Sequence, residues 1–178
     1  MRPGGRQPPP PLKGPAMTEI TALPLTAEAF APFGDVLTTA GEPDKIINAG
    51  FCGRYHDRAN MDFGPEGRAG ISLFNAVPRE MPYTCDLIER HPEGSQAFIP
   101  MHENEWLIIV AEGQDDIPGP IHAFIVPPHT AVNLHRGTWH GVLTPLHAPG
   151  LFAVVDRIGT TVNLEEFGLD APVTVDRA

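Results

Sequence analysis

The stretch EWLIIVAEGQDDIPGPIHAFIVPPHTAVNLHRGTWHGVLTPL, residues 105–146, says most about the fold class of this chain. It contains four short runs rich in valine, isoleucine, leucine or phenylalanine: WLIIVA, IHAFIV, AVNL and HGVL. Proline, glycine, asparagine or histidine residues follow the runs closely, as is common at strand ends and turns. Little room for a helix is left between the runs. The stretch therefore predicts an antiparallel sandwich or barrel and argues against βαβ units.

Four further runs of the same kind lie outside this stretch: GISLFNAV, TCDLIER, SQAFIPM and LFAVVDRI. The whole chain is therefore predicted to be mainly β. A short N-terminal helix is expected at TAEAFAPFGDV, residues 26–36, with Thr26 as its N-cap and Gly34 as a left-handed stop. The segment VNLEEFGLD, residues 162–170, is a second candidate for a short helix.

The first 16 residues, MRPGGRQPPPPLKGPA, differ in composition from the rest of the chain. They contain six prolines and no acidic residue. Such a tract buries too little surface to offset its conformational entropy, so residues 1–16 are expected to be a disordered extension. Met17 opens a segment that reads like a natural start, and residues 17–178 are expected to form one domain.

Charge and composition exclude several classes of function. The chain has 12 basic and 22 acidic residues, and without the extension 9 basic residues remain against the same 22 acids. A nucleic-acid-binding protein would show a basic surface, so no nucleic-acid partner is expected. No apolar run is long enough to span a bilayer, so no membrane partner is expected either. Only two cysteines are present, which favours a reducing, cytoplasmic location.

The segment VNLHRGTWHG, residues 132–141, gathers polar side chains around one turn. In a strand, Asn133 and His135 point to the same face. Gly137 is free to take a positive φ and to bring His140 back on the next strand. The two histidines could bind a metal ion, transfer protons, or simply cap a turn and lie at the surface.

Three other clusters carry ionisable groups. ERHPEGSQAFIP, residues 89–100, places Glu89, Arg90 and His91 before a turn, with Gln96 and Phe98 on one strand face after it. GRYHDRAN, residues 53–60, and the end of VVDRIG, residues 154–159, are also charged. Without a functional role, the first segment is interpreted as a charged strand end followed by an amphipathic strand, the second as a solvated loop, and the third as an exposed ion pair.

Motifs of several enzyme classes are missing from the sequence. It contains no HxH, HExxH or CxxC pattern for a metal, no GxSxG for a nucleophile, and no GxGxxG or GxxxxGK for a phosphate.

The segments GRYHD, GISLFNA, ERHPEGSQAFIPM, VNLHRGTWHG and VVDR, in this order, resemble the bacterial ureidoglycolate lyases. The resemblance extends from about Leu23 to Leu169 and is most specific in ERHPEGSQAFIP and VNLHRGTWH. It implies a cupin-like antiparallel β-barrel, also described as a double-stranded β-helix or jelly roll, and a homodimer. The implied reaction is the elimination of urea from ureidoglycolate to give glyoxylate, in the breakdown of allantoin from purines.

The sequence departs from the pattern of metal-binding cupins. Their first motif carries HxH, whereas this chain has Gln96 and Phe98 at those places. The metal ligands that remain as candidates are His140 and Glu105, with His135 or His102. This set is incomplete, so no cofactor is expected to be required, although a divalent ion stays an open alternative.

General acid–base catalysis is therefore the expected mechanism. Elimination needs a base for the hydroxyl proton and an acid for the departing nitrogen, and we expect His135 and His140 to supply them. Arg90 and Arg136 are the expected partners of the substrate carboxylate, and Gln96 and Asn133 those of its ureido group. The further substrate-binding candidates are Trp139, Arg54 and His56.

Two other functions compete with this one. A metal-dependent cupin enzyme of another type, such as a dioxygenase or an isomerase, would contain a bound metal ion. A non-catalytic sensor would bind a small molecule without turnover. Hydrolysis of the same substrate would release ammonia in place of urea.

Overall fold

Nearly all regular structure in this chain is β-strand. The computed structural model describes residues 18–114 and 116–178, so the extension predicted to be disordered, residues 1–16, lies outside the described residues. The strands are β1 (Thr18–Pro24), β2 (Gly34–Leu37), β3 (Lys45–Ile47), β4 (Cys52–Arg54), β5 (Arg68–Asn75), β6 (Tyr83–Arg90), β7 (Gln96–Pro100), β8 (Trp106–Gln114), β9 (Ile117–Val126), β10 (Ala131–Leu134), β11 (Trp139–Gly141), β12 (Thr144–Pro145), β13 (Leu151–Ile158) and β14 (Glu165–Arg177). The helical elements are α1 (Ala27–Phe30) and the 3-10 turn η1 (Asn48–Gly50).

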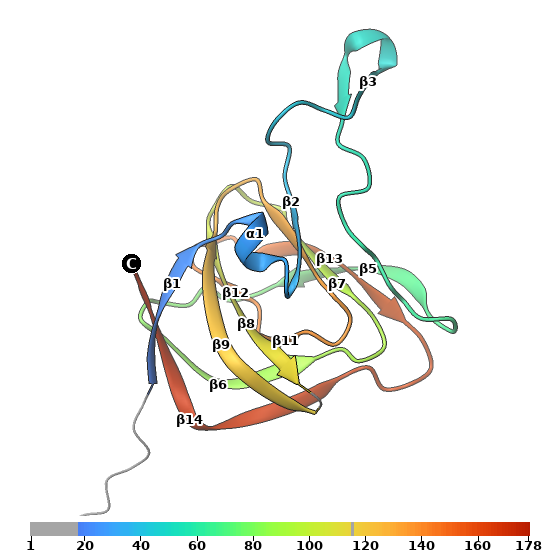
Figure 1. The fold of residues 1–178 in the computed structure, drawn as a ribbon. Coiled ribbons are helices and arrows are strands. Elements are labelled where there is room, and N and C mark those ends of the chain that lie inside the picture. Colours follow the sequence, from blue (N-terminus) through green and yellow to red (C-terminus); the bar gives the residue numbers. More distant parts are fainter. Residues whose placement is uncertain (1–17, 115) are drawn as a thin grey trace, which may run out of the picture.

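Six strands close into a barrel (Figure 1). Their order is β11-β6-β14-β1-β9-β8, and the ring closes because β11 pairs with β8 as well as with β6. The prediction of an antiparallel barrel is wrong at one strand, since β1 runs parallel to both of its neighbours, β14 and β9. The mainly β barrel itself is confirmed.

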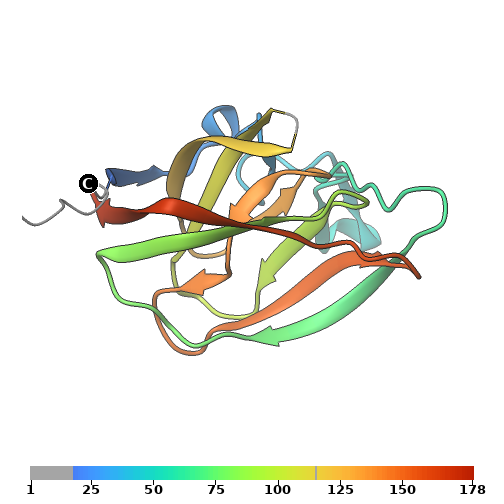
Figure 2. The same ribbon diagram turned by 90° about the horizontal axis from the view of Figure 1, so that it is seen from below.

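A second sheet, in the order β2-β10-β7-β13-β5, packs against the outside of this barrel. Figure 2 shows the long antiparallel pair of β5 and β13 below β6 and β14. The layer between the second sheet and the barrel wall is a hydrophobic core, which includes Phe98 of β7, Trp106 of β8, Phe124 of β9 and Phe152 of β13. A second core fills the barrel and includes Ile88 and Trp139.

The run WLIIVA is apolar throughout because β8 has a core on each side. Trp106, Ile108 and Val110 face the core between the sheets, and Leu107 and Ile109 face the barrel interior. Side chains alternate between the faces of a strand, so a strand covered on both faces loses the usual apolar–polar alternation.

Each of the eight predicted runs overlaps a strand, although HGVL does so only through His140 and Gly141, since Val142 and Leu143 lie outside β11. Both helix predictions need correction. Thr26 does cap α1, where its Oγ1 accepts a hydrogen bond from Ala29 N at 3.1 Å. However, α1 is only one turn long, because Pro32 cannot continue a helix, and Gly34 begins β2 with no left-handed stop. VNLEEFGLD is not helical, since its last residues belong to β14, which pairs with β6 and β1.

The hairpin of β3 and β4 stands away from the two sheets (Figure 1). Asp44 fixes its base by accepting hydrogen bonds from His56 N and Arg58 Nη2, both at 2.9 Å. At its tip, Asn48 and Ala49 have positive φ and Phe51 is 92% exposed. Among the described residues, no helix is both long and apolar enough to cross a membrane.

Candidate active site

The turn after β10 carries the chain from one sheet to the other. Gly137 has φ +78°, as predicted from its position in the turn. However, β11 does not return beside β10: it pairs with β6 and β8 in the barrel wall. The expected hairpin between His135 and His140 is therefore wrong, and the two side chains have different surroundings.

His135 belongs to a polar cluster on the outer face of the second sheet. Its Nε2 lies 3.0 Å from Asp35 Oδ1, and Asn133 Nδ2 donates to Asp35 Oδ2 at 2.9 Å. Asn60 N also donates to Asp35 Oδ2, at 2.8 Å. Burial raises the pKa of Asp35, but these hydrogen bonds outweigh it and hold the pKa below its ordinary value. Asn133 and His135 do share a face, as predicted, and this cluster fastens the segment around Asn60 to the sheet.

His140 lies in the layer between the two sheets and is 2% exposed. Burial lowers the pKa of His140 to about 4, so its ring is neutral near pH 7. Its Nδ1 lies 3.0 Å from the carbonyl oxygen of Gly141. A carbonyl only accepts, so Nδ1 carries the proton and Nε2 keeps its lone pair. That Nε2 is buried and has no hydrogen-bond partner among the described residues.

Glu89 and His91 complete a three-residue cluster with His140. The carboxylate and imidazole atoms of the three side chains lie within 4.8 Å of one another. Glu89 and His140 are directly paired across β6 and β11, and the centres of the His91 and His140 rings are 5.4 Å apart. His91 repeats the pattern of His140: its Nδ1 lies 2.6 Å from a carbonyl, that of Asn163, and its buried Nε2 has no partner among the described residues. Burial raises the pKa of Glu89.

Gln96 and Asp156 carry polar groups beside this cluster. They lie on β7 and β13, and their side chains are hydrogen-bonded to each other. Burial raises the pKa of Asp156 above its ordinary value, although the hydrogen bond with Gln96 opposes this. Gln96 Oε1 and Asp156 Oδ1 are buried without a hydrogen-bond partner in the described part of the chain. An acceptor amide and a carboxylate are thus available next to two imidazoles.

Glu89, His91 and His140 can hold a divalent ion. Two unprotonated imidazole nitrogens and a carboxylate are a common ligand set for transition metals. Ligating histidines usually donate their other ring N–H to a carbonyl or carboxylate, as His91 and His140 do here. The side chains present therefore fit a bound metal ion. The metal ligands predicted from the sequence, His140 and Glu105 with His135 or His102, do not form such a cluster. Glu105 instead pairs with Arg177 and lies 3.8 Å from His147.

The two arginines predicted to bind the substrate carboxylate are engaged elsewhere. Arg90 alternates with Glu89 and His91, so it points to the opposite face of β6, where it lies 4.7 Å from the ring centre of Trp139 and pairs with Glu165 and Asp116. Arg136 donates to Pro92 O at 2.6 Å and is exposed.

The side chains of three other predicted substrate contacts also do not face the His140 ring. Trp139 is buried in the barrel interior, next to Phe167. Arg54 and His56 contact each other near the base of the hairpin, at 2.7 Å.

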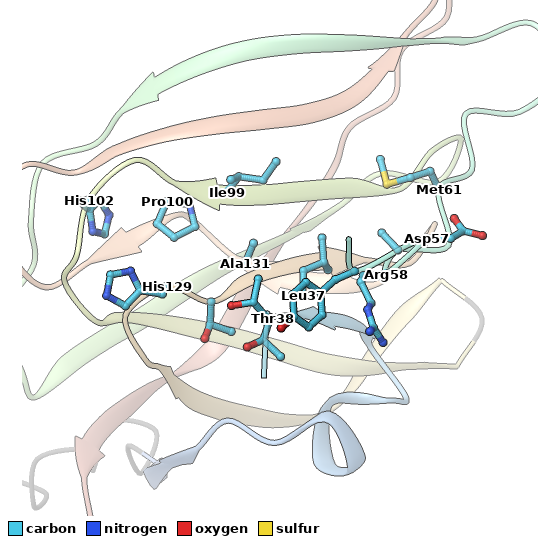
Figure 3. Close-up of a pocket in the computed structure, with 14 residues that line it drawn as sticks. Leu37, Thr38, Asp57, Arg58, Met61, Ile99, Pro100, His102, His129 and Ala131 are labelled. Carbon is cyan, nitrogen blue, oxygen red and sulfur yellow. The ribbon is translucent and has the colours of Figure 1, made fainter. Parts of the chain in front are cut away.

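A cavity of about 580 Å³ opens on the outer face of the second sheet. Figure 3 shows Met61 and Ile99 on one side of it, Leu37 and Thr38 on the other, and His102 and His129 at one end. Ile99 follows Phe98, whose ring faces His140, so the cavity and the cluster lie on opposite faces of the same strand. The cavity lining includes His102, His129 and Asp57, but the one group of three possible metal ligands among the described residues is the cluster around His140.

Known proteins resemble this chain over nearly its full length. A family model described as ureidoglycolate lyase matches residues 17–176. The ureidoglycolate lyase of Rhodobacter capsulatus is 54% identical over 160 residues, which cover 90% of this chain and 99% of that protein.

The chain belongs to the ureidoglycolate lyase family.

Two further relatives agree with this. The ureidoglycolate lyase of Mesorhizobium japonicum is 49% identical over 152 residues, which cover 85% of this chain and 93% of that protein. Ureidoglycolate lyase 2 of Rhizobium meliloti is 43% identical over 163 residues, which cover 91% of this chain and all of that protein. The resemblance inferred from the sequence motifs is confirmed.

In this member of the ureidoglycolate lyase family, the sequence pointed to Arg90 as a substrate contact, while Glu89 and His91 were interpreted only as part of a charged strand end. Glu89 and His91 are two positions apart in a strand, so their side chains share a face and Arg90 points away. Strand alternation in ERHP was the signal that could have identified them. Asp156 also carries a signal, because it ends an apolar strand in which Val154 and Phe152 face the core.

Proposed function

We propose that this chain is a ureidoglycolate lyase that acts in the breakdown of allantoin. Ureidoglycolate carries a hydroxyl and a ureido nitrogen on the carbon next to its carboxylate. Removal of the hydroxyl proton lets that oxygen form a carbonyl, and the C–N electron pair leaves with the nitrogen, which is then protonated. The products are glyoxylate and urea, with no water consumed. The family membership and the names of the relatives support this activity.

We propose the cluster of Glu89, His91 and His140 as the active site. The observation that carries the proposal is that two imidazoles, each with a buried Nε2 that has no partner among the described residues, lie in one cluster with a carboxylate. A buried polar atom without a partner destabilises a protein by about 1–3 kcal/mol, so such atoms tend to mark a functional site. His135 lacks this property because Asp35 already binds it.

We further propose that these three residues hold a divalent metal ion. Glu89 and Asp156 would repel an anionic substrate in an already acidic protein, and a bound cation reverses that local field. When bound, the ion would act as a Lewis acid toward the oxygens of the substrate. The alternative is the metal-free reaction, in which the same two imidazoles transfer the protons.

Gln96 and Asp156 are the proposed substrate contacts. Gln96 Oε1 is a free acceptor for the N–H groups of the ureido moiety, while the Gln96 amide holds Asp156. Asp156 Oδ1 is free to take the hydroxyl proton and to return it to the departing nitrogen. One carboxyl group can serve both steps because the proton is removed from one substrate atom and delivered to another.

The homodimer and the cytoplasmic location are also proposals. Support for a homodimer comes from two apolar surfaces, the hairpin tip with Phe51 and the outer sheet face with Ile71 and Leu73, which are 76% and 67% exposed. The cytoplasmic location is supported by Cys52 and Cys85, which are both free thiols. The two packed sheets support a cupin-like jelly roll as the finer description of the fold.

The activity is tested by incubating purified protein with ureidoglycolate and measuring urea, glyoxylate and ammonia separately. Equal amounts of urea and glyoxylate without ammonia are expected. Ammonia in place of urea would show that the enzyme is a hydrolase. The same assay after chelation, with Zn²⁺, Mn²⁺ or Ni²⁺ added back one at a time, separates the metal-assisted reaction from the metal-free one.

A further inference from the structure

Asn163 makes two contacts with the turn that carries His91. Its backbone carbonyl oxygen lies 2.6 Å from His91 Nδ1, and its side-chain Oδ1 accepts a hydrogen bond from Glu93 N at 2.7 Å. The residue lies in the loop between β13 and β14, about seventy positions away along the chain. A single residue thus holds both the ring of His91 and the backbone two residues further on.

The first contact determines where the His91 ring carries its proton. A carbonyl oxygen only accepts hydrogen bonds, so the neutral ring is held with the proton on Nδ1 and a lone pair on Nε2. That Nε2 is buried and unpartnered, and His91 belongs to the cluster with Glu89 and His140. With the opposite tautomer, His91 would present an N–H to the cluster and could neither bind a metal ion nor accept a proton there.

The second contact keeps the Asn163 carbonyl in position. Residues 159–164 form no regular structure, and a peptide group in a loop can rotate unless it is fixed. The bond between Asn163 Oδ1 and Glu93 N fixes it relative to the turn. A second, separate bond joins the same loop to this turn, since the Thr161 hydroxyl donates to the Glu93 carboxylate, which also pairs with Arg157 at 3.1 Å.

We propose that Asn163 is a positioning residue, whose side chain holds its own carbonyl against His91 and thereby sets the His91 tautomer for the active site. The inference rests on the proposed function, because Asn163 would act on the active site through His91. This role is more than anchoring of the loop between β13 and β14. Thr161 anchors the same loop without touching His91, so the two residues can be tested separately.

The test compares four variants of the full-length protein with wild type. Asn163→Leu removes the acceptor at similar volume, and Asn163→Asp keeps an oxygen in the same place. Thr161→Val removes the other anchor of the loop. Val162→Ala is the matched control, because Val162 lies in the same loop and is 85% exposed.

The first measurement is the ¹⁵N chemical shift of each His91 ring nitrogen in metal-free protein, assigned by comparison with His91→Gln. Wild type, Asn163→Asp, Thr161→Val and Val162→Ala are expected to show the Nδ1–H tautomer. Asn163→Leu is expected to show a mixture of tautomers. The inference is overturned if wild-type His91 is protonated on Nε2, a result that needs no variant to fold. It is also overturned if Asn163→Leu keeps a pure Nδ1–H ring, or if Thr161→Val shows the same mixture.

The second measurement is Zn²⁺ affinity by calorimetry. Loss of a residue that orients a ligating histidine typically weakens metal binding by about 10–100-fold, and this loss is expected for Asn163→Leu but not for Asn163→Asp. Equal Zn²⁺ affinity of wild type and Asn163→Leu would contradict the inference. Neither measurement uses turnover, so a protein without lyase activity would overturn the proposed function and leave the tautomer result to be judged by itself.

Discussion

His135 and His140 are five positions apart in the chain, yet their side chains have different surroundings in the structure. His135 is held by Asp35 on the outer face of the second sheet, and His140 faces Glu89 and His91 between the sheets. The sequence predicted the turn at Gly137 correctly. It could not show that the strand after the turn joins the other sheet, because that depends on the pairing of β11 with β6 and β8, which are distant in the chain.

The Asp35 cluster predicts a pH dependence of stability at the residue scale. The pKa of Asp35 is lowered in the folded protein, so this group stabilises the fold above its unfolded pKa, about 3.9, and the contribution is lost as the pH falls through the folded pKa. Asp35→Asn should therefore be less stable than wild type at pH 7, and the difference should shrink below pH 4. Urea unfolding at several pH values measures it. A difference that does not change from pH 7 to pH 3 would contradict this assignment.

At the scale of elements, strands were easier to predict than their partners. Local composition predicted β5 to β11 and β13, because strand ends are marked by turn residues and strand interiors by branched or aromatic side chains. It did not predict β1 to β4 or β14. Two short helices were predicted where tertiary pairing decides the outcome. The segment EEFGLD has a helix-compatible composition, but it is extended because its first four residues pair with β6, which is distant in the chain. The candidate site was predicted in part for the same reason: His140 and Gln96 were found, whereas Glu89, His91 and Asp156 depend on which faces meet.

Gly34 gives a prediction at this scale. β2 runs so close to β10 that a Cβ on Gly34 would lie 1.9 Å from the carbonyl oxygen of Asn133. Gly34→Ala should therefore displace β2 and lower the free energy of unfolding by about 1–3 kcal/mol, the range found for overpacked sites. Gly168→Ala in β14 is the control, because a Cβ there meets nothing within 4 Å. Chemical denaturation of both variants measures the effect, and equal stability of the two would show that β2 adjusts without strain.

At the scale of the whole molecule, charge and exposed apolar surface act against each other. The chain carries a formal net charge of −10, so two copies repel each other. The exposed Phe51, Ile71 and Leu73 provide apolar area that favours association in spite of this repulsion.

Sedimentation equilibrium should accordingly give about twice the chain mass of 19.2 kDa, and association should tighten as salt screens the repulsion. Leu73→Glu should weaken the dimer, since it places a charge on the apolar face. Val162→Glu, at an exposed position in the loop between β13 and β14, should not. A monomeric wild type, or dimers unaffected by Leu73→Glu, would show that this face is not the interface.

The central claim is that the chemistry takes place between the two sheets, at Glu89, His91 and His140. Glyoxylate release by His140→Gln, His91→Gln and His135→Gln tests it most directly, with folding of each variant checked by circular dichroism. The account predicts a loss of at least about 10²-fold for His140→Gln and His91→Gln, as is typical when a catalytic group is removed. His135→Gln should keep turnover close to wild type and lose mainly stability. Wild-type turnover in His140→Gln, or a loss in His135→Gln as large as in the other two, would contradict the account.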